Sequence, residues 1–129
     1  IDGAVNMATT LLVTGKATAS TSANITQQPL ATSGTTISWN ALTHANAYLV
    51  PAANLTIDNP SNSVEGAIIS VEIAMNGTPR TIAWHTNFEF AASTAPTATA
   101  TANKTDIFSF RYNGSVWQEI GRVQNLAQT

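Results

Sequence analysis

The side chains of this chain that could do acid–base chemistry or bind a metal are two histidines and seven acidic residues. His44 lies in the loop-like stretch THANA, and His85 follows Trp84 at the predicted end of a strand. No G-x-S-x-G pattern of a nucleophile elbow is present, and neither H-x-H nor H-E-x-x-H spacing occurs. Since Cys is also absent, we predict two surface imidazoles, no metal site and no cofactor.

The acidic residues leave one catalytic interpretation open. Glycosidases use two carboxylates about 5–10 Å apart, and the sequence allows Glu72 to pair with Glu89, or Asp106 with Glu119. The favoured interpretation places these charges on solvated faces of strands. We therefore predict that the chain is not an enzyme, and we name no catalytic residue. The sequence also identifies no individual ligand-binding residue.

Composition narrows the fold class and the partners. The 129 residues suit one main domain, 43% of them are hydrophobic, and only 9% are charged. Thr, Ser and Asn supply most of the polarity, which is typical of strands and turns rather than surface helices. The net charge of −2 and the absence of a basic run argue against nucleic-acid binding. No apolar run approaches the ~20 residues of a membrane helix, so we predict no membrane insertion.

The chain divides into an arm and a head. Residues 1–30 alternate small polar residues with sparse apolar ones and show no helical period. Such a segment buries too little apolar surface to offset its ordering entropy, unless neighbouring chains order it. Because the sequence begins with Ile1, we interpret it as a processed product or a fragment. We predict an extended arm or a linker over residues 1–30 and a β-sandwich head over residues 31–129.

Strand patterns fill residues 31–90. The clearest is GAIISVEIAM, which places alternate apolar side chains from Ala67 to Met75 on one face. TTISWNAL and RTIAWHTNF bring Trp39 and Trp84 into phase with Ile37 and Ile82, and NAYLV and NLTI lie between them. Residues 91–104 follow as a surface loop or an edge strand. No helix is predicted, so we expect an antiparallel, jelly-roll-like β-sandwich.

A β-hairpin is predicted near the end of the chain, in DIFSFRYNGSVWQEI. Asn113-Gly114 is a favoured pair for a two-residue type I′ turn. Pairing across that turn would set Trp117 opposite Phe110 and Ile120 opposite Ile107.

The aromatic residues have two interpretations. Exposed aromatic faces could form a platform for sugars. Trp39, Trp84 and Trp117 share faces with predicted core residues, so core packing is favoured for them, while Tyr48 could be exposed.

In their order along the chain, several short motifs resemble a β-sandwich domain frequent in bacteriophage tail fibres and related virion appendages. They are a turn before a glycine and a strand, a strand ending in Trp, an Ala-Pro loop, and a hairpin of the form D-(apolar)-x-(aromatic)-x-Tyr-Asn-Gly-x-x-Trp. These motifs fall on Asn59-Pro60, Gly66, Ile82-Ala83-Trp84, Ala95-Pro96, and Asp106 through Trp117.

The arm also carries a likeness to these fibres, and two features depart from the pattern. LLVTGKATASTSANIT is similar to the L-x-V-x-G-x-x-T segments of trimeric fibre shafts. Phe88-Glu89-Phe90 stands where an aromatic residue, often Trp, occurs, which would alter a surface. Only one shaft-like unit is visible.

The resemblance implies a structural protein of the virion, a fibre or decoration module, assembled as a homotrimer with residues 1–30 around the threefold axis. It further implies attachment to a host-surface glycan or to other virion proteins, and a terminal hairpin that closes the sandwich. The alternative is a carbohydrate-binding or lectin-like domain cut from a larger protein. A small hydrolase is the least favoured hypothesis.

Overall fold

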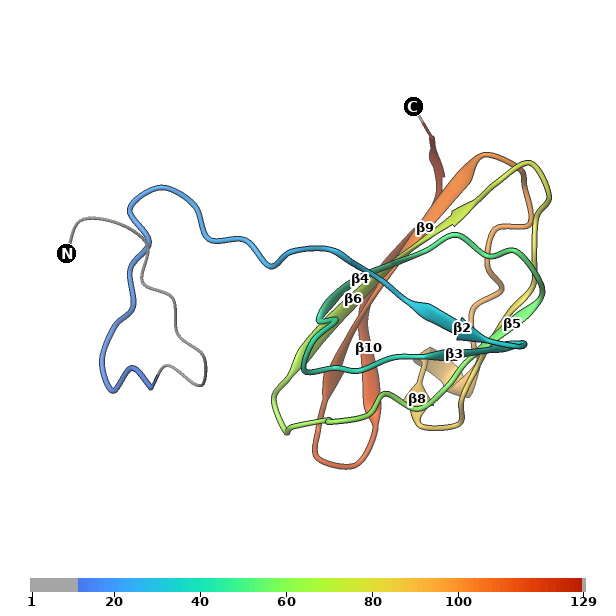
Figure 1. Ribbon diagram of the computed structural model, residues 1–129. Coiled ribbons are helices and arrows are strands. Elements are labelled where there is room, and N and C mark those ends of the chain that lie inside the picture. Colours follow the sequence, from blue (N-terminus) through green and yellow to red (C-terminus); the bar gives the residue numbers. More distant parts are fainter. Residues whose placement is uncertain (1–11, 129) are drawn as a thin grey trace.

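The computed structural model describes residues 12–128, which are built almost wholly of β-strands in two sheets (Figure 1). In order across the first sheet, sheet A, lie β1 (Gln28–Pro29), β4 (Asn46–Leu49), β6 (Ile68–Met75), β9 (Lys104–Tyr112), β10 (Trp117–Ala127) and β8 (Phe88–Glu89). Sheet B contains β2 (Ala31–Ser33), β3 (Thr36–Ser38), β5 (Leu55–Ile57) and β7 (Ile82–Trp84). One short 3₁₀ turn at Ala91–Ser93 completes the elements. The prediction of an all-β chain is confirmed for this part of the sequence.

The two sheets are mixed, which corrects the prediction of antiparallel pairing. From β3 to β8 the chain changes sheet after every strand, so it returns to each sheet in its original direction. Accordingly β4 pairs with β6 in parallel, and β3, β5 and β7 are parallel to one another. The antiparallel pairs join β2 with β3, β6 with β9, and β9 with β10. A jelly-roll-like arrangement is not confirmed.

The hairpin of β9 and β10 lies inside sheet A, between β6 and β8 (Figure 1). On one side Phe110 of β9 pairs with Ile69 of β6, and on the other side Trp117 of β10 pairs with Phe88 of β8. The hairpin therefore joins strands that would otherwise not be linked within this sheet.

The inward faces of both sheets form one hydrophobic core, as the predicted alternation requires. In β6 every second side chain from Ile69 to Met75 is buried. The largest fully buried side chains include Trp39, Trp117, Phe108 and Phe110. Burying a large apolar side chain contributes about 1.5–3 kcal/mol, so these aromatic residues are major contributors to stability.

The hairpin exists, but its predicted turn and register were wrong. Trp117 pairs with Tyr112 instead of Phe110, a shift of two residues that keeps Trp117 on the buried face. Gly114 alone has a positive φ in the turn, 97°, so Asn113 does not adopt the type I′ conformation. Instead the Asn113 side-chain oxygen accepts hydrogen bonds from the amides of Ser115 and Val116.

A β-bulge explains the second pairing error. The register shifts between Glu119 and Gly121, which leaves Ile120 exposed and sets Val123 opposite Ile107. A bulge inserts one unpaired residue into a strand, and here it changes the face on which the following side chains lie.

Residues 12–27 contain no strand or helix, and they run away from the sheets in Figure 1. They contact sheet A near β1, where the Asn46 side chain donates to the Ile25 carbonyl and the Gln27 side chain donates to Glu72. The predicted arm at residues 1–11 lies outside the described residues. Within residues 12–128 no helix has the length and apolar character that a membrane crossing requires.

Candidate functional site

Each histidine side chain makes a contact with a neighbour in its own loop. His44 Nδ1 lies 2.7 Å from the Thr43 hydroxyl. His85 Nδ1 accepts a hydrogen bond from the Asn87 amide, and its Nε2 lies 3.9 Å from Asp58. Over residues 12–128 no group of three His, Asp or Glu side chains is placed to hold a metal ion. Both imidazoles are partly exposed.

The structure does not bring the two candidate carboxylate pairs together. Glu72 is on β6 and Glu89 is on β8, with β9 and β10 between them, so three strand spacings of about 14 Å in total separate their backbones. Glu119 of β10 pairs with Phe110 of β9. Asp106 lies four residues from Phe110 along β9, so the backbones of Asp106 and Glu119 are about 13 Å apart. Glu72 accepts a hydrogen bond from Gln27 and Glu89 accepts one from Gln118, so these two carboxylates have separate partners.

Asp106 is not the solvated strand-face charge that the sequence predicted. It is 2% exposed, and its carboxylate accepts four hydrogen bonds. The Thr99 amide and hydroxyl donate at 2.7 Å each, the Asn125 amide at 2.9 Å, and the Gln124 side chain at 3.2 Å. Burial alone would raise the pKa of Asp106, but these hydrogen bonds outweigh burial and hold it below its ordinary value.

The hydrogen bonds of Asp106 connect two segments that are distant in the sequence. Thr99 belongs to the loop between β8 and β9, and Asn125 lies at the second bulge of β10 with a positive φ of 64°. One carboxylate thus fixes the loop to the irregular end of the hairpin.

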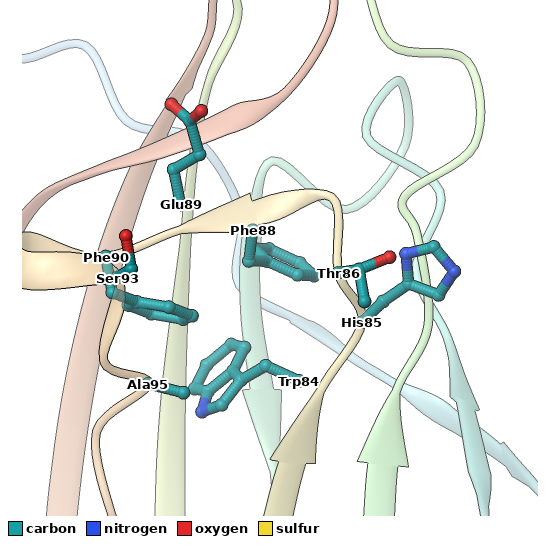
Figure 2. A pocket seen from close by; sticks show the side chains of 8 residues that line it. All are labelled: Trp84, His85, Thr86, Phe88, Glu89, Phe90, Ser93 and Ala95. Carbon is teal, nitrogen blue, oxygen red and sulfur yellow. The ribbon is translucent and has the colours of Figure 1, made fainter.

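A pocket of about 440 Å³ opens where β7 leads into β8 (Figure 2), and it is the strongest candidate for a small-ligand site. The rings of Trp84, Phe88 and Phe90 gather on one side of β8, whereas the Glu89 side chain points away from them. The pocket is lined by Trp84, His85, Thr86, Phe88, Glu89, Phe90, Ser93 and Ala95.

Two further features mark this pocket. Ala92 and Ser93 both have a φ of 54°, a strained conformation for residues with a Cβ that often occurs at ligand-contacting loops. The indole N–H of Trp84 is buried and has no hydrogen-bond partner in the described protein. Trp84 also packs on the core, with its ring 5.0 Å from that of Phe108. Its predicted core role is therefore confirmed, although one part of the ring borders the pocket.

Phe88-Glu89-Phe90 departs from the pattern of the resembled family, but the sequence alone did not indicate a pocket there. The alternation of this tripeptide sends two rings inward and one carboxylate outward. The sequence therefore contained the signal for the direction of these three side chains. The part of the pocket wall formed by Ser93 depends on the turn at Ala91–Ser93, which no sequence pattern predicted.

No protein-family model matches the chain, and no curated protein matches it.

Proposed function

We propose that this chain is a structural module of a virion, a fibre or decoration element with a β-sandwich head and an N-terminal assembly arm. The single hydrophobic core that both sheets share supports the interpretation of the strands as one head domain. Such a module attaches the particle to a host surface or to other virion proteins.

The exposed apolar side chains of the arm are the observation that carries the proposal. Leu12, Val13 and Ile25 all lie in water when the chain is alone, and Leu12 is 82% exposed. Within residues 12–27, hydrogen bonds to the head are made at Ile25 and Gln27, before β1 joins sheet A. Association with the arms of two other copies would bury this surface, and a homotrimer is the assembly that the fibre-like sequence of the arm favours.

A matched pair of leucines tests this proposal. Leu12 lies in the arm, and Leu42, which is 74% exposed, lies in a loop of the head. We expect Leu12→Asp to shift the chain from trimer to monomer in sedimentation velocity, because it loses a buried leucine and brings three carboxylates together. Leu42→Asp should leave the trimer intact. Equal sedimentation of both variants as trimers would contradict the proposal.

Attachment to a host-surface glycan is the form of this function that the pocket favours. Sugars stack on aromatic rings and bond to hydroxyl and imidazole groups, and the walls of the pocket combine Trp84 and Phe90 with Ser93 and His85. The same observation supports the alternative of a carbohydrate-binding domain from a larger protein. A glycan array separates sugar attachment from a purely structural role, in which no sugar would bind.

A further inference from the structure

Two nearly identical tripeptides, Asn76-Gly77-Thr78 and Asn113-Gly114-Ser115, can undergo a reaction of their own backbone. In an Asn-Gly pair, the backbone nitrogen of the glycine can attack the side-chain carbonyl carbon of the asparagine. A new N–C bond forms, and the amide proton leaves with the side-chain nitrogen as ammonia. Water then opens the resulting succinimide ring to aspartate or isoaspartate. Glycine favours this reaction because it has no Cβ to hinder the approach of its nitrogen.

The Asn113 side chain is held within the hairpin turn between β9 and β10. Its oxygen accepts hydrogen bonds from the amides of Ser115 at 3.0 Å and Val116 at 2.9 Å, and its own amide donates to the Val116 carbonyl. The two strands are paired directly beside this turn. Attack by the Gly114 nitrogen therefore requires the side chain to leave two hydrogen bonds inside a closed turn.

Asn76 lies in a connection of a different kind. It follows β6 of sheet A and leads to β7 of sheet B, so the strands on its two sides do not pair with each other. Asn76, Gly77 and Thr78 are all exposed, and within the described chain the Asn76 oxygen accepts one hydrogen bond, from the Thr78 amide at 3.0 Å. Among residues 12–128, and apart from its chain neighbours, no atom lies within 4 Å of the place where Gly77 would carry a Cβ. This segment therefore has room to rearrange.

We infer that Asn76-Gly77 is a site of spontaneous deamidation in the folded chain, whereas the hairpin turn protects Asn113. The reaction consumes only water and replaces a neutral amide by a carboxylate, so it adds a negative charge to a chain whose formal net charge is −2. The isoaspartate product also adds a methylene group to the main chain between β6 and β7. The inference concerns a single copy of the chain and is independent of the proposed function.

Peptide mapping by mass spectrometry tests this inference on the full chain, kept folded at mildly alkaline pH. The conversion of each asparagine to its acid is followed with time, and isoaspartate is identified by fragmentation. We expect Asn76 to convert severalfold faster than Asn113, since one hydrogen bond has to break there instead of two. In urea, where neither turn is formed, the two tripeptides should convert at similar rates.

Gly77→Ala is the control variant. The φ of Gly77 lies outside the left-handed region and the place of the added Cβ is open, so alanine fits without strain. The variant should convert more slowly at Asn76 and at an unchanged rate at Asn113. The inference would be overturned by a folded chain in which Asn76 does not convert or Asn113 converts as fast. An unchanged rate at Asn76 in Gly77→Ala would also overturn it, because the glycine nitrogen would then not be the attacking group.

Discussion

Replacing Asp106 by Asn is expected to lower the free energy of unfolding by about 2–4 kcal/mol, because buried donors would lose their acceptors. Each carboxylate oxygen accepts two hydrogen bonds, so either orientation of the new amide sets its NH₂ group against donors. Among these donors, the amides of Thr99 and Asn125 cannot rotate to accept in return. Urea denaturation measures the difference.

Asp58→Asn is the control for this prediction. Asp58 is exposed, and among residues 12–128 its carboxylate accepts a hydrogen bond from the neighbouring Asn59 amide and lies 3.9 Å from His85 Nε2. We expect its replacement to change the free energy of unfolding by about 0.5 kcal/mol or less. Equal effects of Asp106→Asn and Asp58→Asn would show that the buried network does not stabilise the fold.

The pH dependence of stability follows from the same carboxylate. Since the pKa of Asp106 is lower in the folded chain than in the unfolded chain, its ionisation stabilises the fold above the unfolded pKa of about 3.9. That contribution is lost as the pH falls through the folded pKa. The unfolding free energy of Asp106→Asn should therefore fall less steeply than that of the wild type below about pH 4.

Replacing Phe110 by Ala is expected to cost about 3–5 kcal/mol, which for a domain of this size approaches the whole stability. Phe110 is fully buried at the centre of the aromatic cluster, with its ring 4.8 Å from Phe88, 5.4 Å from Trp84 and 6.5 Å from Trp39. The substitution removes contacts to strands of both sheets and leaves a cavity between them.

Phe90→Ala is the control for this prediction. It shows whether the loss of stability depends on the central position of Phe110 or on the removal of any aromatic ring from the cluster. Phe90 packs on the same cluster, 5.9 Å from Phe110, but it is partly exposed beside the pocket. We expect a clearly smaller loss of unfolding free energy for Phe90→Ala in urea denaturation. A loss for Phe110→Ala no larger than that for Phe90→Ala would contradict the placement of Phe110 at the centre of the core.

Alternation within single strands was predictable from the sequence, whereas pairing between strands was not. Ile69, Val71 and Ile73 recur at every second residue, and this local period fixes their buried face whatever the neighbouring strand is. The parallel winding depends on which sheet each strand joins, and short strands such as β5 carry no signal for that choice. Two bulges in β10 also change which face of the sheet the later residues of that strand occupy, so simple alternation assigned them to the wrong face.

The candidate sites were less predictable because they depend on loops. Asp106 precedes alternating aromatic residues in the sequence, and only the return of the loop at Thr99 and of β10 at Asn125 surrounds it with donors. The pocket depends similarly on Ala92 and Ser93, whose positive φ values no pattern indicates. The role of the arm stays a prediction, supported by its exposed leucine and isoleucine.

The mass in solution, with and without the arm, tests the proposed assembly most directly. Light scattering would be applied at micromolar concentration to the full chain and to a chain lacking residues 1–24, which retains the contacts of Ile25 and Gln27 with the head. We predict three times 13.5 kDa for the full chain and the mass of one copy for the shortened chain. A full chain with the mass of a single copy would contradict the proposal of an arm-assembled virion module.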